Sequence, residues 1–214
     1  MAIILDEAGA AILDEGGSAI LDEAGLPQGE RQLVRLAVAS FFGGTQVTTD
    51  AGVCFQGGPL ASFGLGTAYP YTVRHAPDEY YTAGMPDGQN WGCVLSTTRL
   101  ERNTGLDSYG GKYSGYWARR YTIECELALI CELPHIEVAG AGLDDLVDAM
   151  EAMVFADRTL GTNDGSKGVR IIQAGPGRAG IRDVTPRFEA LDEVKGRYAA
   201  EATVTFEALV MIAA

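Results

Sequence analysis

The sequence predicts an α+β fold, in which two helices pack on one face of a largely antiparallel sheet. Three observations predict it. Residues 121–133 and 199–212 alternate apolar with polar side chains, as half-buried strands do. Residues 30–42 and 143–158 repeat apolar side chains at helical spacing. Helices and strands do not follow one another in strict alternation along the chain, as they would in a parallel α/β sheet, so antiparallel pairing is favoured.

An N-terminal arm, residues 1–29, is expected ahead of a single domain that covers residues 30–214. Three octads in the arm share Ile-Leu-Asp-Glu followed by Ala-Gly or Gly-Gly, which suits short strands joined by turns and disfavours a helix. Because a repeated motif makes one contact several times, we expect the arm to bind a neighbouring surface or to stay mobile; low-complexity sequence without a role is the alternative. The residues expected to make these contacts are Ile4, Leu5, Ile12, Leu13, Ile20 and Leu21.

The first helix is expected at residues 30–42, where Leu33, Leu36 and Phe41 share one face and Gly43 ends the segment. After it, residues 57–115 are expected to form a loop-rich insert with many Gly, Tyr and Pro residues. Long loops in a domain of this size commonly carry contacts to partners.

Short extended pieces are expected near residues 52–56, 68–74 and 91–100. The clearest strand, Tyr121–Leu133, is ended by Pro134. The second helix has Asp144 and Asp145 in its first turn, where negative charge is favourable, and its expected core side chains are Leu143, Leu146, Val147, Met150 and Val154.

Shorter strands are expected at Val169–Gln173 and Ile181–Phe188, each reached through a glycine-containing turn. The chain is then expected to finish on a long strand, residues 199–212, that pairs within the main sheet.

Composition and charge exclude several classes of protein. Apolar residues make up 47% and charged residues 21%, as in ordinary globular proteins, and no apolar run approaches the ~20 residues that span a bilayer. A secretory signal is not expected either, since the N-terminus has acidic pairs in place of a basic start. With a net charge of −13, the chain would repel nucleic acid unless its basic residues gather on one face.

The four cysteines, Cys54, Cys93, Cys125 and Cys131, form no Cys-x-x-Cys pair. Cys125 and Cys131 share one predicted strand, on which their Cα atoms would be about 20 Å apart, too far for a disulfide. We expect reduced, partly buried thiols.

No grouping of residues predicts catalysis. The only histidines, His75 and His135, lack partners at the spacings of a metal site, and no nucleophile motif is present. The segment Gly175-Pro176-Gly177 lacks the Lys-Ser/Thr of a phosphate-binding loop and is predicted to be a hairpin turn. We therefore expect no catalytic residue, no cofactor and no metal, and a protein that is not an enzyme.

Basic and aromatic residues alternate around residues 99–120. Such residues bind single-stranded nucleic acid by stacking and charge, and they are also enriched in protein interfaces. Because the chain is acidic, a protein interface is favoured. The candidate interface residues are Arg99, Arg102, Tyr109, Tyr113, Tyr116, Trp117, Arg119 and Arg120.

The order of elements resembles that of tail-terminator proteins of long-tailed bacteriophages, over residues 30–56 and 116–214. The resemblance rests on the front helix, the acidic strand Tyr121–Leu133, the acidic-start helix Leu143–Arg158 and the final long strand. It implies a subunit of a hexameric ring that caps the tail tube and joins it to the head. The implied partners are further copies of the chain, a tail-tube protein and a head–tail connector protein.

The same resemblance implies that viral DNA passes through the ring without specific binding, and that the protein resides in the virion after assembly in the host cytoplasm, with no membrane contact. An acidic channel would repel phosphates and let DNA slide. The candidate channel-lining acids are Glu124, Glu126 and Glu132. A tail-tube subunit or another neck connector is the nearest alternative, and a binding module that uses the Tyr/Arg-rich loops is the alternative of another class.

Overall fold

The computed structural model describes residues 29–50, 52–72, 79–83, 91–102, 107–109, 116–163, 168–175, 189–192 and 196–212. The octads of the arm and the strand expected at 181–188 lie outside these residues. In chain order the elements are α1 (Glu30–Gly43), β1 (Gly44–Thr49), β2 (Gly52–Gly57), η1 (Pro59–Phe63), β3 (Leu65–Tyr69), α2 (Glu79–Thr82), β4 (Trp91–Arg102), β5 (Asp107–Tyr109), β6 (Tyr116–Glu132), η2 (Leu133–His135), α3 (Ile136–Ala156), β7 (Arg170–Gly175), β8 (Glu189–Asp192) and β9 (Arg197–Ile212).

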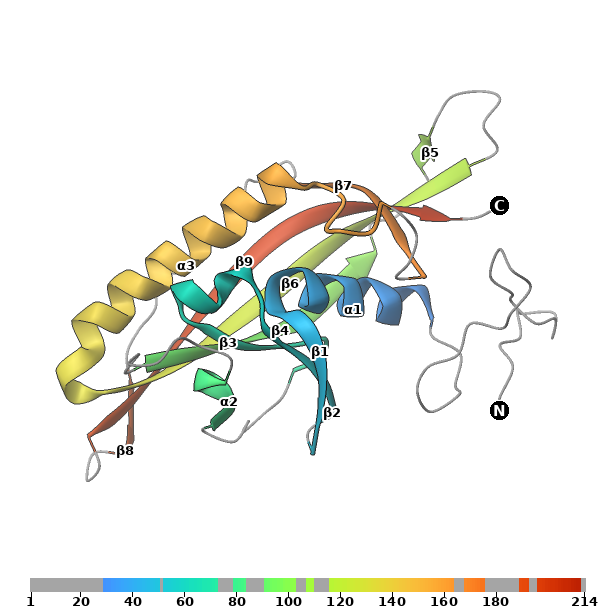
Figure 1. The fold of residues 1–214 in the computed structure, drawn as a ribbon. Helices are drawn as coiled ribbons and strands as arrows, with labels where there is room; N and C mark the ends of the chain where they lie inside the picture. The colour runs from blue at the N-terminus through green and yellow to red at the C-terminus, as the bar shows by residue number, and fades with distance from the viewer. Residues whose placement is uncertain are drawn as a thin grey trace.

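All the described strands join one sheet, whose main path runs β1-β2-β3-β4-β6-β9-β7 (Figure 1). Strand β5 pairs with β6 and β8 with β9, beside that path. The β3–β4 pair is parallel, and every other described pair is antiparallel. The predicted α+β class with a largely antiparallel sheet is therefore confirmed.

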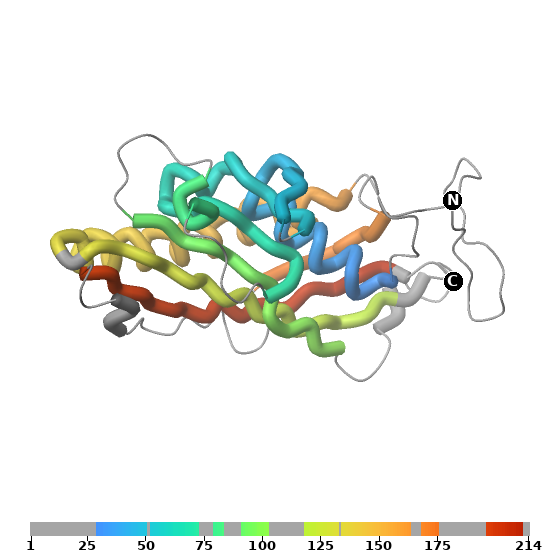
Figure 2. Tube along the Cα trace, turned by 90° about the horizontal axis from the view of Figure 1, so that it is seen from below, coloured from blue at the N-terminus to red at the C-terminus, as the bar shows by residue number. Residues whose placement is uncertain are grey.

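Strands β4, β6 and β9 run side by side through the length of the domain (Figure 2). The β6–β9 ladder is unbroken from Trp117 opposite Ile212 to Glu132 opposite Arg197. The side chains of β6 alternate between buried and half-buried from Tyr121 to Ile130, which is the pattern of a strand with one face in the core. The alternation that predicted these two strands from the sequence thus corresponds to the two faces of the sheet.

Helices α1 and α3 cover the same face of the sheet, as the sequence predicted (Figure 1). Helix α1 buries Val34, Val38 and Phe42, and the ring of Phe42 packs edge-on against Phe206 of β9, with centroids 6.2 Å apart. Helix α3 adds Leu143, Leu146, Val147, Met150 and Val154, which are the core side chains expected from its spacing.

Helix α2 lies against the other face, over β3 and β4. Its residue Tyr81 places a carbonyl group where a Cβ atom on Gly66 or Gly92 would project, so both strands need glycine there. Tyr80 and Tyr81 also pack against a small second core of Cys54, Tyr69 and Val94.

The sequence predicts a loop-rich insert at residues 57–115, yet this segment contributes β3 and β4 to the middle of the sheet. Strand β4 lacks the alternation by which a half-buried strand is identified. Residues Trp91 to Thr97 are buried without alternation, because α1 and α3 cover one face and α2 covers the end of the other. The expected strand at 91–100 runs to Arg102, and the one expected at 68–74 lies at Leu65–Tyr69.

Helix α3 begins at Ile136, earlier than the predicted start at Leu143. Gly140 and Gly142 weaken the helical pattern in the sequence, but the indole ring of Trp91 packs directly on Gly142. Tertiary packing therefore extends the helix through glycines that propensity disfavours.

The described cysteines are Cys54, Cys93, Cys125 and Cys131, and all are buried free thiols, as expected. Burial raises the pKa of Cys125 to about 12 and raises the pKa of Cys93 further still. Both thiols stay protonated and act as small apolar side chains in the core.

Candidate functional site: the polar face of the sheet

The polar face is the side of β4, β6 and β9 that is turned away from α1 and α3. Cross-strand pairing brings its residues together, although they are up to about a hundred positions apart in the chain. The residues of the polar face are Arg99 and Glu101 of β4, Arg120, Thr122, Glu124 and Glu126 of β6, and Glu201, Thr203, Thr205 and Glu207 of β9.

Carboxylates occupy the middle of the polar face, with small neighbours on β9. Glu124 lies opposite Thr205, and Glu126 lies opposite Thr203. Glu201, which is exposed, lies opposite Ala128. The neighbours on β9 are therefore short, whereas on the β4 side Arg99 lies opposite Glu124 and Ser96 opposite Glu126.

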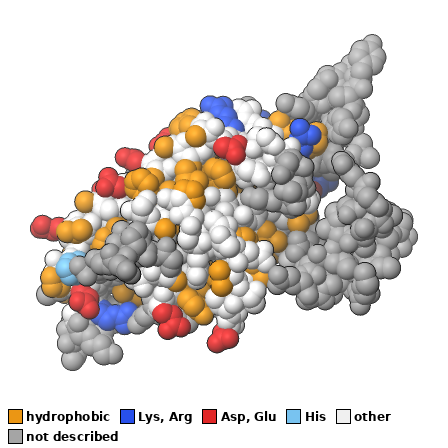
Figure 3. All heavy atoms as spheres, viewed as in Figure 1, with side chains coloured by type: hydrophobic (Ala, Val, Ile, Leu, Met, Phe, Trp, Pro, Cys, Tyr) orange, Lys and Arg blue, Asp and Glu red, His pale blue; other side chains and the backbone are white. Residues whose placement is uncertain are grey.

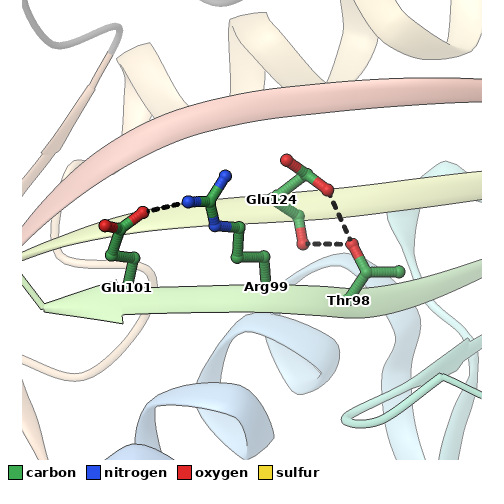
Figure 4. Close-up of polar contacts among 4 residues, drawn as sticks. All are labelled: Thr98, Arg99, Glu101 and Glu124. Carbon is green, nitrogen blue, oxygen red and sulfur yellow. Dashed lines mark hydrogen bonds and ion pairs between the residues drawn. The ribbon is translucent and has the colours of Figure 1, made fainter.

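A bulge in β4 sets how the face is arranged next to Glu124. The β4–β6 register shifts between Thr97 and Arg99, which leaves Thr98 as the extra residue. The Thr98 hydroxyl lies 3.2 Å from the backbone oxygen of Glu124 and 3.3 Å from its carboxylate, and it donates to this pair of acceptors (Figure 4). A neutral hydroxyl holds the carboxylate in place without cancelling its charge.

The arginines of the polar face are paired with carboxylates of the same face. Arg99 directs its guanidinium to Glu101, away from Glu124 (Figure 4). Arg120 forms an ion pair of 3.2 Å with Glu207. Both arginines are therefore balanced by carboxylates of the same face, and the remaining acids, Glu124, Glu126 and Glu201, leave its net charge negative.

Arg119 lies on the opposite face from its neighbour Arg120, because successive side chains of a strand alternate. It forms an ion pair with Glu30, the first residue of α1, and Glu30 also accepts a hydrogen bond of 2.9 Å from the Tyr121 hydroxyl. Burial and the nearby Glu30 carboxylate raise the pKa of Tyr121. This candidate interface residue thus fixes the start of α1 to the sheet within its own chain.

Arg35 supports the bulge from the helix side. Its guanidinium donates to the backbone oxygen of Thr97 and, at 3.3 Å, to that of Pro70, and it stacks over Tyr71 at 5.2 Å from the ring centroid. Burial lowers the pKa of Arg35. The Thr97 carbonyl group, next to the bulge, therefore gains a charged donor.

The remaining predicted residues are less closely grouped. Arg102 is exposed at the end of β4, and Glu132 is exposed at the end of β6, opposite Arg197. Tyr109 belongs to β5, and Tyr116 and Trp117 begin β6, where the structure describes backbone pairing alone. The following predicted residues lie outside the described part: Tyr113, His75, Ile4, Leu5, Ile12, Leu13, Ile20 and Leu21.

Sequence reasoning missed Glu201 and Glu207 as members of the acidic group with Glu124 and Glu126. Their signal was present, since Glu201, Thr203, Thr205 and Glu207 alternate with buried residues. What the sequence did not reveal was that β6 and β9 are neighbours, which depends on pairing between distant segments.

A shallow pocket of about 150 Å³, lined by Thr159, Arg170 and Met211 among others, is smaller than the ~300 Å³ at which typical ligand sites begin. Within the described ranges, no three His, Cys, Asp or Glu residues are grouped as metal ligands. No helix of the described part has the length and hydrophobicity of a membrane-spanning helix.

Acidic side chains also lie along the outer side of α3 (Figure 3). Its exposed acids include Asp144, Asp145 and Asp148. The negative charge of the chain is thus shared between a sheet face and a helix surface on opposite sides of the core.

No family model matches this chain, and no curated protein matches it.

Proposed function

We propose that this protein is a structural virion protein that forms a ring at the head-proximal end of a phage tail, where it caps the tail tube and joins the tube to the head. In this ring the polar face of each subunit turns toward the channel. Neighbouring copies, a tail-tube protein and a head–tail connector protein are its partners, and it acts without catalysis.

The observation that carries the proposal is the asymmetry of the sheet. One face of β6 and β9 packs on α1 and α3, whereas the other bears Glu124, Glu126 and Glu201. A broad sheet with one helix-covered side and one polar side suits a ring whose sheets line a channel and whose helices lie outside.

Charge supports a channel for DNA rather than a DNA-binding surface. Lys and Arg side chains on a surface gain affinity from counterion release, and carboxylates do the opposite. Because Arg99 and Arg120 pair with Glu101 and Glu207 and further carboxylates surround them, acids outnumber arginines among the residues of the polar face. Duplex DNA would be repelled evenly from such a lining and would remain free to slide.

A tail-tube subunit or another neck connector is the second candidate, since the same asymmetry would suit a tube. Negative-stain electron microscopy of the purified full-length chain separates these functions. A terminator gives closed rings of uniform diameter that do not stack, whereas a tube subunit gives long tubes.

The charge of the polar face supplies a control within the same experiment. Moderate salt is expected to leave the rings unchanged, because the proposal gives Arg99 and Arg120, which are paired within the chain, no part in the self-contacts. Single particles without rings, together with tight binding of a defined ligand, would instead indicate a binding module and overturn the proposal.

A further inference from the structure

The connection between α3 and β7 carries an arginine corner, defined here as Arg158, Arg170 and the shallow pocket beside them. Two hydrogen bonds tie this connection to β7. The backbone N–H of Ala174 donates to the carbonyl oxygen of Arg158 at 2.6 Å, and the N–H of Ile171 donates to the hydroxyl of Thr162 at 2.7 Å. The arginine corner therefore has a defined position at the end of the helix layer.

Both arginines of the corner are exposed. Arg158 stacks over the ring of Phe155, with its guanidinium carbon 5.7 Å from the centroid. Among the residues that the structure describes, no carboxylate forms an ion pair with Arg158 or Arg170. The neighbouring acid, Asp157, is engaged in the turn, where its carboxylate accepts from the backbone N–H and the hydroxyl of Thr159 at 2.9 and 2.6 Å. The corner thus offers two cations to an acidic segment.

The pocket adds an apolar site beside Arg170. It has a volume of about 150 Å³, and Ile171, Ile172 and Met211 form the apolar part of its lining. A cavity of about 150 Å³ accepts a group of the size of benzene, so this one admits a single Leu or Ile side chain. The corner therefore fits a peptide in which an aliphatic residue stands next to acids.

The N-terminal arm has this composition. In each octad Ile and Leu precede Asp and Glu, and residues 1–29 contain six acids but no Lys or Arg. Opposite charge attracts such a segment to Arg158 and Arg170, whereas the acidic outer side of α3 repels it.

The arm joins the domain close to the arginine corner. The carbonyl oxygen of Gly29, the first described residue, accepts a hydrogen bond of 3.1 Å from the N–H of Leu33, one turn along α1. A Cβ atom on Gly168 would lie 3.3 Å from the side chain of Leu33, and Gly168 is two residues before Arg170. Helix and strand spacings therefore put Gly29 on the order of 20 Å from Arg170.

This spacing selects the octad nearest to α1. Its last acid, Glu23, is six residues before Gly29, and a segment of that length spans up to about 20 Å when extended. Residues 20–23 can therefore reach the corner of their own chain. A short flexible connection gives an effective concentration on the order of millimolar, which favours this corner over that of a separate copy.

We propose that residues 20–23 of the arm dock on the arginine corner of the same chain. Leu21 occupies the pocket, and the two acids that follow it pair with Arg158 and Arg170. The arm then acts as a strap that covers both cations and closes the corner to other acidic segments. The inference is independent of the proposed ring, since it needs a single copy of the chain.

Crosslinking in a mixture of isotopes tests this directly. The full-length chain carries Ala19→Cys in the arm and Asn163→Cys at an exposed residue of the pocket lining. Unlabelled and ¹⁵N-labelled chains are mixed in urea, refolded together, treated with a short bismaleimide, digested and measured by mass spectrometry. The buried native thiols are expected to give little background.

Docking within one chain predicts linked peptides whose two halves are both unlabelled or both labelled. Linked peptides that join one labelled and one unlabelled half in the statistical proportion would place the arm on another copy. Absence of linked peptides would leave the corner without the arm. Either of these two results overturns the inference.

Ala141→Cys in place of Asn163→Cys is the matched control for position, because it is an exposed residue in the other half of α3. Its yield of linked peptide should be several-fold lower. An equal yield would indicate random contact of the arm and would contradict docking at the corner.

Charge reversal at the corner supplies the control for chemistry. Arg158→Glu/Arg170→Glu should lower the yield at Asn163→Cys several-fold, and Arg99→Glu/Arg102→Glu, the same charge change at exposed residues of β4, should leave it unchanged. Equal yields for the two pairs of substitutions would show that the two arginines of the corner do not hold the arm.

Discussion

The indole ring of Trp91, the first residue of β4, packs directly on Gly142 in the first half of α3, in the space that a Cβ atom there would occupy. The same ring fills the position of a Cβ atom on Gly64, which follows η1 and has a φ of 99°. One side chain thus locks α3 and the turn after η1 to the end of β4.

Replacement of Gly142 by Ala tests this contact. Alanine favours a helix by about 1 kcal/mol over glycine, yet the methyl group would collide with a buried ring. We expect a net loss of up to about 2 kcal/mol in the free energy of unfolding, since overpacking costs about 1–3 kcal/mol and the helix propensity of alanine offsets about 1 kcal/mol of it. Urea denaturation measures it.

Combination of Gly142→Ala with Trp91→Leu supplies the control for that measurement. The smaller side chain makes room for the methyl group, so the two substitutions should be less destabilising together than the sum of the single variants. Strict additivity would contradict the contact.

The anchor at the start of α1 gives a second prediction. The side chains of Glu30 and Arg119 are 25% and 28% exposed, and Tyr121 donates to the same carboxylate. Glu30→Gln should lower the free energy of unfolding by about 1–2 kcal/mol, because a charge-assisted contact becomes a neutral one.

Glu101→Gln is the matched control for Glu30→Gln. The Glu101–Arg99 pair has more than half of each side chain exposed, and water screens it, so the loss should stay below about 0.5 kcal/mol. Equal losses for the two variants in the same denaturation series would argue against an anchoring role for Glu30.

The buried thiols predict how stability depends on pH. Burial raises the folded-state pKa of Cys125 to about 12, above the ~8.5 of an unfolded thiol, so the unfolded chain releases this proton first as pH rises. The contribution is complete below about pH 8.5 and falls above it, by at most about 1.4 kcal/mol per pH unit for each thiol.

Urea midpoints between pH 7 and 11 measure this dependence, with Cys125→Ala as the comparison. The variant should start less stable but lose stability less steeply at alkaline pH. Identical slopes for the two chains would show that this thiol does not titrate as its burial implies.

The acids of the polar face make a prediction about DNA. The triple variant Glu124→Lys/Glu126→Lys/Glu201→Lys should bind linear duplex DNA on the order of tenfold more tightly than the parent chain, with a steep salt dependence. Fluorescence anisotropy over a salt series measures it.

The matched control places the same three reversals on the outer side of α3, as Asp144→Lys/Asp145→Lys/Asp148→Lys. The net charge changes equally, but a helix surface outside the channel would contact fewer phosphates, so the gain in affinity should be smaller. Equal gains would mean that the sheet face is not the surface nearest to DNA.

Much of the fold could be predicted because the spacing of apolar residues in the sequence matches the positions that are buried in the structure. In β6 and β9 alternate residues enter the core, and in α1 and α3 the apolar spacing matches the covered face. Local pattern was sufficient there. It failed for β1, where Val47 is the sole large apolar residue, and for the first turns of α3, where packing on Trp91 outweighs the weak helix propensity of glycine.

The candidate site was only partly predictable for a different reason. The polarity of Glu124 and Glu126 follows from the sequence of one strand, but their grouping with Glu201 depends on a ladder between distant segments. Arg119 and Arg120 lie on opposite faces of β6, where they pair with Glu30 and Glu207. The sequence analysis grouped them as one cluster of basic and aromatic residues and did not separate the two faces.

Native mass spectrometry of the full-length chain, over a range of concentrations, tests the central claim most directly. The account predicts one closed species at a fixed multiple of the 22.7 kDa subunit mass, with six copies expected from the resemblance to tail terminators. A chain that stays monomeric at every concentration would contradict it.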